Sequence, residues 1–236
     1  MKKFFIGLGI VGAALFVLLF VARLTGMLQF YKIPTPSNEP TLKIGDLVYT
    51  STLKKPSPYS FIAFTNEYVD SITSEYSSPG SVFLHRLCGM PGDILEMKNG
   101  VLWVNHRNFD EGLNLNRMYK ITTKEFYLID EEDINAHEAS GGFMTMGDSS
   151  MVIFDDQLLN KYRSKLHLVR FKFIDTINGP FKWLDKNPAW TVDDFGPLKI
   201  PANCYFVLGD NRYNALDSRY FGLIEKEDLR GVALNK

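Results

Sequence analysis

The sequence predicts a mainly β protein: a β core interrupted by an inserted mixed α/β lobe, behind one N-terminal transmembrane helix. Three observations support this fold class. Aromatic residues make up 14% of the chain and lie in short apolar segments, which favours strands over a helical bundle. These segments are bounded by Pro, Gly, Asn and Ser, which are the residues of turns. Residues 4–22 carry no charged side chain.

Residues 4–22 are expected to form a membrane anchor. A helix needs roughly 20 apolar residues to cross a bilayer core, and this run follows Lys2 and Lys3 and ends at Arg23. A cleavable signal peptide is the alternative, but its apolar part usually spans only about 7–15 residues. In addition, the bulky Phe20 stands where a cleavage site after Ala22 would need a small residue. The two lysines favour a cytoplasmic N-terminus, with everything from Arg23 onward outside the cytoplasm.

The rest of the chain divides into a β core and a less regular insertion. Short β-prone runs predict strands at residues 47–52, 61–64, 82–88, 94–97 and 101–104. Asn99-Gly100 predicts a hairpin between the last two strands. An acidic segment at 123–139 is compatible with a helix, and 169–177 alternates as a strand does. We therefore expect an N-terminus and anchor over 1–23, a core from 24–104 and 201–236, and an inserted lobe over 105–200.

Composition excludes several classes of function. A formal net charge of −1 argues against a surface that coats nucleic acid, and the chain has no phosphate loop or dinucleotide fingerprint. Cys88 and Cys204 lack the spacing of a zinc site, so neither a metal nor another cofactor is expected. The two thiols could be paired or free, and we favour free thiols because both lie in apolar runs.

The chemistry is concentrated in three polar segments, at residues 34–42, 85–93 and 209–222. In the first, prolines at 34, 36 and 40 restrict φ and exclude a helix. Such a stiff backbone suits a serine, Ser37, that must be held in position to attack a carbonyl. Taken alone, however, a serine in a proline-rich stretch is usually part of an ordinary loop.

The three segments, in this order behind one apolar helix, resemble the type I signal peptidases (leader peptidases, peptidase family S26). The resemblance covers residues 33–53, 82–104 and 201–224. The family's first segment looks like P-S-x-S-M-x-P-T, which this chain matches at Pro34, Ser37, Pro40 and Thr41. The resemblance implies that Ser37 is the nucleophile, and that Thr35 and the Ser37 backbone N–H stabilise the oxyanion. Asn38 replaces the family's methionine, which removes apolar surface that could face lipid or substrate.

The second segment departs from the bacterial pattern K-R-x-x-G-L-P-G-D at the position of its base. The chain has His85 where the bacterial enzymes have lysine, and it matches at Arg86, Gly89, Pro91, Gly92 and Asp93. Histidine titrates near neutral pH and needs little tuning to act as a base. Signal peptidases of the endoplasmic reticulum and of archaea also place histidine here, so the resemblance implies a Ser–His pair. A surface histidine, a dead site, or a base from elsewhere are the alternatives.

The third segment is similar to the family's G-D-N-R-D-N-S-x-D-S-R. Ala215 replaces the serine that helps to orient the lysine, which is a change coupled to the loss of that lysine. A histidine base would instead need a carboxylate on Nδ1, so that Nε2 faces Ser37. We expect Asp217 in this orienting role, with Asp210 as the alternative.

The remaining site predictions concern support and substrate. Asp210, Arg212 and Arg219 are expected to brace the site. Ile33 and Leu84, and more weakly Tyr31, match positions that line the family's substrate pockets, although such apolar residues are equally compatible with the core. His106, His137 and His167 match no motif position.

The implied function is that of a serine endopeptidase in the bacterial inner membrane, single-pass with a cytoplasmic N-terminus and an extracytoplasmic catalytic domain. Its partners would be the signal peptides of exported preproteins and the lipid bilayer. One alternative is a processing peptidase dedicated to a single substrate, of the conjugative-pilin type. Another is a non-catalytic anchored assembly factor, against which the intact Ser37 argues.

Overall fold

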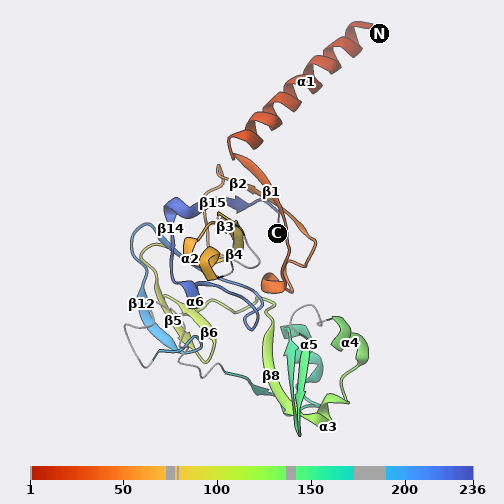
Figure 1. Cartoon of the computed structure of the whole chain (residues 1–236), viewed down its shortest axis with the longest axis vertical. Helices are drawn as coiled ribbons and strands as arrows, with labels where there is room; N and C mark the ends of the chain where they lie inside the picture. Colours follow the sequence, from red (N-terminus) through yellow and green to blue (C-terminus); the bar gives the residue numbers. More distant parts are fainter. Residues whose placement is uncertain (1, 73–77, 79, 137–141, 173–189, 236) are drawn as a thin grey trace.

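The computed structural model describes residues 2–72, 78, 80–136, 142–172 and 190–235. Helix α1 (Lys2–Leu24) stands apart from a β-rich body (Figure 1). Its apolar side chains are exposed on all sides, as shown by Phe16 and Leu24, both 71% exposed. Within the described ranges, Phe4–Leu24 is the stretch long and apolar enough to cross a membrane.

A seven-stranded antiparallel sheet forms the centre of the body, in the order β1-β2-β15-β3-β4-β13-β14. Its strands are β1 (Leu28–Lys32), β2 (Leu47–Ser51), β3 (Phe61–Phe64), β4 (Phe83–Gly89), β13 (Cys204–Leu208), β14 (Ile224–Glu225) and β15 (Leu229–Ala233). The last strand, β15, pairs with both β2 and β3, and β13 pairs with β4. The first and last thirds of the chain therefore build one sheet.

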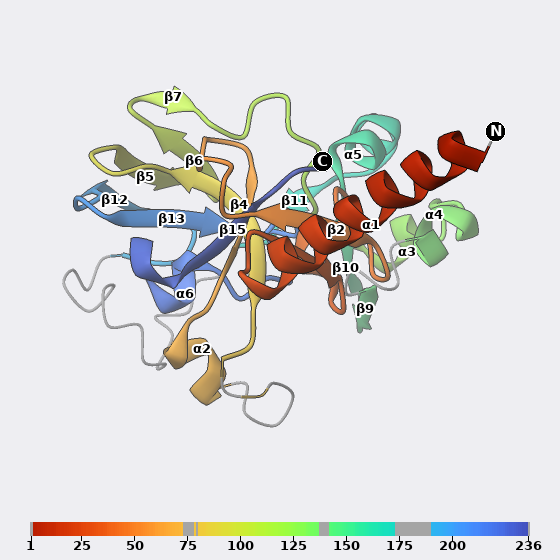
Figure 2. The same cartoon turned by 90° about the horizontal axis from the view of Figure 1, so that it is seen from above.

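A second antiparallel sheet, of four strands in the order β12-β5-β6-β7, packs on the first. It consists of β5 (Ile94–Lys98), β6 (Val101–Val104), β7 (Arg107–Asn108) and β12 (Phe195–Lys199). The predicted hairpin joins β5 to β6, with positive φ at Asn99 (51°) and Gly100 (66°). In Figure 2, β5, β6 and β7 lie at the upper left of the body and helix α2 (Glu67–Ile72) lies at its lower edge.

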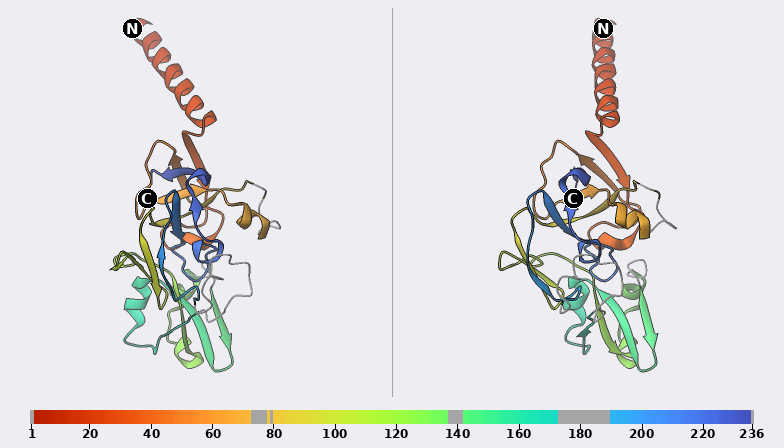
Figure 3. Two further views of the ribbon diagram at one scale, coloured as in Figure 1. Left: turned by 90° about the vertical axis from the view of Figure 1, so that its left-hand side faces the viewer. Right: turned by 60° about the vertical axis from the view of Figure 1, so that its left-hand side comes forward.

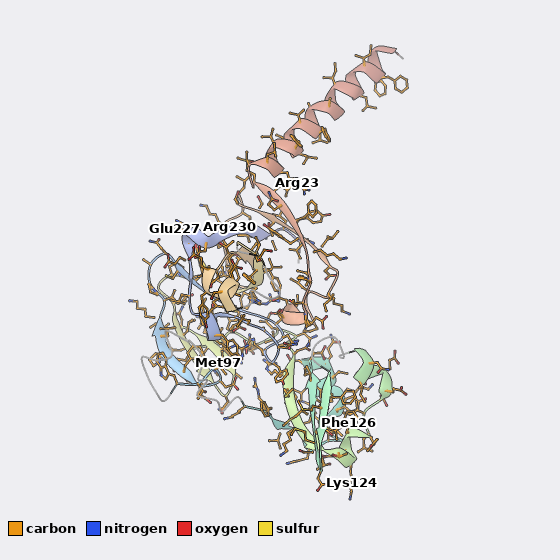
Figure 4. The ribbon with its side chains drawn as sticks, viewed as in Figure 1. Arg23, Met97, Lys124, Phe126, Glu227 and Arg230 are labelled. Carbon is orange, nitrogen blue, oxygen red and sulfur yellow. The ribbon has the colours of Figure 1, made fainter. Side chains whose placement is uncertain are left out.

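The third sheet forms the inserted lobe, in the order β11-β8-β10-β9. The elements of the lobe are β8 (Arg117–Thr122), α3 (Thr123–Phe126), α4 (Glu131–Ala136), β9 (Phe143–Met146), β10 (Ser149–Phe154), α5 (Asp156–Tyr162) and β11 (Val169–Arg170). The lobe has its own core, which includes Ile121, Val152 and Tyr162. It lies at the end of the body away from α1 (Figures 1 and 3). Figure 4 shows the same separation, with Arg23 at the foot of α1 and Phe126 in the lobe.

The predicted bounds of the insertion, 105–200, are too wide at both ends. β7 pairs with β6 and β12 pairs with β5, so both strands belong to the core. The physical reason is burial: Phe109 and Phe195 pack with Leu95, Leu102 and Phe206 between the two core sheets. The acidic segment does contain helices, α3 and α4. The strand predicted at 169–177 appears as β11, and residues 173–177 lie outside the described residues.

Short elements complete the body and hold the polar segments. They are the 3-10 turns η1 (Pro36–Asn38) and η3 (Lys226–Asp228) and helix α6 (Ser218–Phe221). Both cysteines are free: Cys88 is buried in the core and Cys204 is half-buried. Burial raises the pKa of the Cys88 thiol far above its usual range, so it packs as a small apolar residue.

Candidate active site

One cleft of about 680 Å³ gathers most of the predicted site residues. Its walls come from the end of β1, from η1, from β4 and from the loop that precedes α6. The predicted residues that line it are Tyr31, Ile33, Thr35, Ser37, Leu84 and His85, together with Asn38 and Leu216. Three segments that are distant in sequence therefore meet at one concave surface.

Ser37 lies in η1, where the proline-rich backbone makes a single tight turn. The turn is closed by the backbone N–H of Glu39, which donates to the Pro36 carbonyl at 3.0 Å. The hydroxyl oxygens of Ser37 and Thr35 lie 2.7 Å apart. The proposed nucleophile and the proposed oxyanion donor are thus in direct contact.

The third polar segment supports the backbone of Ser37. The Ser37 carbonyl accepts a hydrogen bond from the Asn211 backbone N–H at 3.1 Å, and the Asn211 side chain donates to the Pro36 carbonyl at 3.3 Å. Gly209 lies so close that a Cβ on it would be 2.4 Å from the Ser37 carbonyl oxygen. Glycine at 209 therefore permits the approach of β13 to the nucleophile turn.

His85 is buried on β4, and both of its ring nitrogens face oxygen atoms. Nδ1 lies 3.1 Å from Oδ1 of Asn38, and Nε2 lies 2.9 Å from the carbonyl oxygen of Leu216. The orientation expected from sequence, with an aspartate on Nδ1 and Nε2 directed at Ser37, is not the one found. The Asn38 amide occupies the position predicted for the carboxylate.

Burial lowers the pKa of His85 below its ordinary value. The negative charge of Asp217 and the Leu216 carbonyl oppose this effect without cancelling it. The imidazole is therefore neutral at neutral pH, which is the state that a general base requires.

Asp217 does not bind His85, which corrects the expected orienting role. Its carboxylate accepts hydrogen bonds from Nε and Nη2 of Arg219, both at 2.9 Å, and from the Gly209 backbone N–H at 3.1 Å. It also caps α6 by accepting from the Arg219 backbone N–H. The physical reason is that a buried guanidinium must be paired, and a carboxylate two residues away is its nearest partner.

Asp210, the alternative for that role, is engaged in the same way. Arg86 donates to it through Nε at 2.7 Å and through Nη2 at 2.5 Å, and Thr41 donates to the same carboxylate. Arg212 forms a comparable pair with Asp110, with two contacts of 2.6 Å. Asp210, Arg212 and Arg219 thus each form a buried ion pair beneath the cleft.

Asn38 is the residue of this site that the sequence interpretation missed. It was expected to affect a surface facing lipid or substrate, yet it is only 4% exposed and points inward. Its Nδ2 donates to the Leu84 carbonyl at 2.6 Å while its Oδ1 faces His85. The available signal was the coincidence of two departures from the bacterial pattern, at positions 38 and 85.

The predicted substrate residues occupy the cleft wall and the core together. Ile33 is 4% exposed and packs with Leu42, Val48 and Phe61, and the half-buried Leu84 contacts this cluster. Tyr31 is half-buried on β1. Of the other histidines, His106 and His167 are exposed, and His137 lies outside the described residues. Among the described residues, His, Cys, Asp and Glu form no cluster of three or more that could hold a metal ion.

Comparison with known proteins identifies the family of this chain. The family described as "Signal peptidase, peptidase S26" matches residues 6–235. A signal peptidase I of Buchnera aphidicola is 26% identical over 235 residues, covering 91% of this chain and 71% of the relative. Signal peptidase I P of Bacillus subtilis subsp. natto is 26% identical over 219 residues, covering 92% of this chain and 80% of the relative.

A crystal structure of a signal peptidase I from Enterococcus faecalis is also similar. It is 21% identical, with 76% of this chain and 97% of that chain covered, at a TM-score of 0.35. The match over residues 6–235 shows that the chain belongs to the signal peptidase family, peptidase S26. The chain is accordingly a serine endopeptidase, and its membership of this family indicates that it cleaves signal peptides.

Proposed function

We propose that this protein is a membrane-anchored signal peptidase that uses Ser37 and His85 as its catalytic pair. The observation that carries the proposal is the shared cleft, whose lining includes both the Thr35–Ser37 hydroxyl pair and the buried neutral imidazole of His85. A serine needs a nearby base to become a nucleophile at neutral pH. Among the described residues, His85 is the histidine that lines this cleft.

In the proposed reaction, Ser37 Oγ attacks the scissile carbonyl carbon while its proton passes to His85. The Thr35 hydroxyl and the Ser37 backbone N–H donate to the oxyanion of the tetrahedral intermediate. The imidazolium then gives its proton to the leaving amine, which leaves an acyl-enzyme on Ser37. A water molecule, deprotonated by His85, hydrolyses the ester and restores the enzyme.

The substrate would lie in the cleft as an extended peptide. The apolar walls formed by Ile33, Leu84 and Val82 suit short apolar side chains. Extended peptides commonly bind by adding a strand beside such walls, with alternate side chains entering the pockets. These features favour the small-x-small sites of signal peptides over a broad range of sequences.

Helix α1 would hold the site at the membrane surface, with the N-terminus in the cytoplasm and the body outside it, in the inner membrane of a bacterium. A helix that is apolar on every side is stable when lipid covers it. Strand β1 runs from the foot of α1 toward η1, so the anchor and Ser37 are joined by a short, ordered path (Figure 1). The Arg23 guanidinium lies 4.3 Å above the Phe30 ring, which links the end of α1 to β1.

The test is cleavage of a preprotein with a small-x-small site by the full chain in detergent. Ser37→Ala and His85→Ala are each expected to lower kcat on the order of a thousandfold or more, as members of one catalytic unit. His106→Ala is the matched control, because its side chain is 77% exposed and outside the cleft. Full activity of His85→Ala would refute the pair. Cleavage of one natural substrate alone would indicate a dedicated processing peptidase, and an inert, folded wild type a non-catalytic factor.

A further inference from the structure

Two donors of Asn211 hold the turn that carries Ser37. The Asn211 backbone N–H donates to the Ser37 carbonyl at 3.1 Å, and its side-chain amide donates to the Pro36 carbonyl at 3.3 Å. Asn211 is fully buried. A shift of the Asn211 backbone therefore moves the Ser37 turn, because hydrogen bonds keep their strength only within a narrow range of distance and angle.

The backbone on both sides of Asn211 is held by Asn116, which lies just before β8, where the chain enters the lobe. The Asn116 N–H donates to the Asp210 carbonyl, and the Asn116 carbonyl accepts from the Arg212 N–H, both at 3.0 Å. These two bonds form a parallel bridge between Asn116 and Asn211. The start of the lobe is thus attached directly to the segment that supports the nucleophile.

The Arg212 side chain is held by Asp110, a residue outside all three polar segments. Nη1 and Nη2 of Arg212 each donate to the Asp110 carboxylate at 2.6 Å, and both side chains are buried. Such a two-pronged contact fixes the guanidinium plane as well as its distance. Burial acts to raise the pKa of Asp110, but the positive charges of Arg212 and Arg117 hold it below its ordinary value, so the carboxylate is ionised.

Asp110 is itself connected to both the core and the lobe. The Leu102 backbone N–H of β6 donates to its carboxylate at 3.3 Å, and Nη2 of Arg117 in β8 donates to it at 3.4 Å. Arg117 also contacts Asp156 of α5 at 3.1 Å. The Asp110 carboxylate therefore joins Arg212 to a strand of each sheet that flanks it.

We propose that Asp110 is a positioning residue for the nucleophile. By fixing the Arg212 side chain it fixes the backbone of residues 210–212, and with it the two Asn211 donors that hold the Ser37 turn. This inference rests on the proposed role of Ser37 and does not depend on which group accepts the serine proton. It gives the connection into the lobe a part in the reaction, although the described residues that line the cleft lie outside residues 105–200.

Asp110→Asn is the primary test, because asparagine keeps the size of the side chain and removes the charge that holds Arg212. With the full chain in detergent, we expect kcat for preprotein cleavage to fall about 10- to 100-fold with KM little changed, because Ser37 moves while the cleft walls stay in place. Hydrogen exchange of the backbone amides in residues 209–214, followed by mass spectrometry, should become faster, while β3 and β4 exchange as in wild type.

Asp133→Asn is the matched control, because it breaks an ion pair inside the lobe. The Asp133 carboxylate accepts from Nζ of Lys161 and from the Tyr162 hydroxyl, both at 2.6 Å. This variant should lower the thermal stability of the lobe and leave both kcat and the exchange of residues 209–214 unchanged. An equal fall of kcat in Asp133→Asn would contradict the inference, because any weakening of the lobe would then have the same effect.

Arg212→Lys provides a second measurement if Asp110→Asn does not fold. Lysine keeps a positive charge beside Asp110 but loses the two-pronged contact, so the pair persists while residues 210–212 are less constrained. We expect kcat to fall about 10-fold with faster exchange of residues 209–214. A folded Arg212→Lys with the kcat and exchange of wild type would overturn the inference.

The two proposals can fail separately. A folded Asp110→Asn with the kcat of wild type, beside an inactive Ser37→Ala, would overturn the role of Asp110 and leave Ser37 as the nucleophile. Cleavage by Ser37→Ala, or a wild type that cleaves no preprotein, would overturn the proposed function. Faster exchange of residues 209–214 in Asp110→Asn would still support Asp110 as the residue that holds this segment.

Discussion

Gly209→Ala should lower catalytic activity much more than it lowers stability, because the added methyl group contacts the nucleophile turn itself. A Cβ at 209 would lie 2.4 Å from both the Ser37 carbonyl oxygen and the Ala215 Cβ. Ordinary van der Waals contact begins at 3.4 Å, so each of the two separations must grow by about 1 Å. Gly209 does not have a positive φ, so its backbone conformation is compatible with alanine and only these two contacts oppose the substitution.

The displacement should affect kcat more than folding. A misplacement of about 1 Å in a catalytic group costs on the order of 100-fold in rate, whereas overpacking by one methyl group costs about 1–3 kcal/mol. We therefore expect kcat/KM for preprotein cleavage to fall about 100-fold while the protein stays folded. Urea unfolding followed by tryptophan fluorescence measures the second quantity on the same sample.

Gly89→Ala is the matched control for this prediction. A Cβ at 89 would lie 2.5 Å from Cδ1 of Ile200, in the core rather than beside Ser37. It should lower stability and leave the cleavage rate of the folded protein near that of wild type. Ala215→Gly added to Gly209→Ala relieves one of the two contacts, so it should recover stability but not activity. Near-wild-type cleavage by Gly209→Ala would refute the claim that this contact positions Ser37.

Three further predictions follow from other contacts of the site. Because burial lowers the pKa of His85 below its ordinary value of 6.5, the acid limb of the kcat/KM profile should lie below pH 6.5, and an acid limb above pH 6.5 would contradict a histidine base. The same shift makes stability decline as the pH drops below 6.5, because the unfolded chain binds the proton more tightly than the folded one. Asp217→Asn should lower the free energy of unfolding by about 3–5 kcal/mol, because it leaves the buried Arg219 guanidinium without its counter-charge, and a loss below about 1 kcal/mol in urea unfolding would show that the pair does not brace the site. Thr35→Val should reduce kcat by about 10²–10³ with KM little changed if its hydroxyl serves the oxyanion, whereas an equal loss with a folding defect in thermal unfolding would assign it a structural role.

The sequence alone determined the architecture around the site and the identity of its polar segments. A short apolar run predicted β3 at 61–64 and Asn-Gly predicted the β5–β6 hairpin, because an apolar strand bounded by turn residues and an Asn-Gly turn each have a local signature. The motif around Ser37 and His85 was equally visible, since each segment is short and continuous. The extent of the lobe was predicted less well, because β7 has only two residues and β12 contains Gly196 and Pro197, which are uncommon inside strands. Both strands are held in the core by Phe109 and Phe195.

The tertiary structure decided which of the polar groups bind one another. Asp217, Asp210 and Asn38 all belong to the motif segments, and nothing in their spacing reveals which one meets the ring of His85. Burial determines the pairing, because the buried guanidinium groups of Arg86 and Arg219 each require a carboxylate. Arg86 pairs with Asp210, and Arg219 pairs with Asp217. An uncharged amide remained for the buried imidazole, and its orientation depends on the Leu84 carbonyl from a strand 46 residues away in sequence.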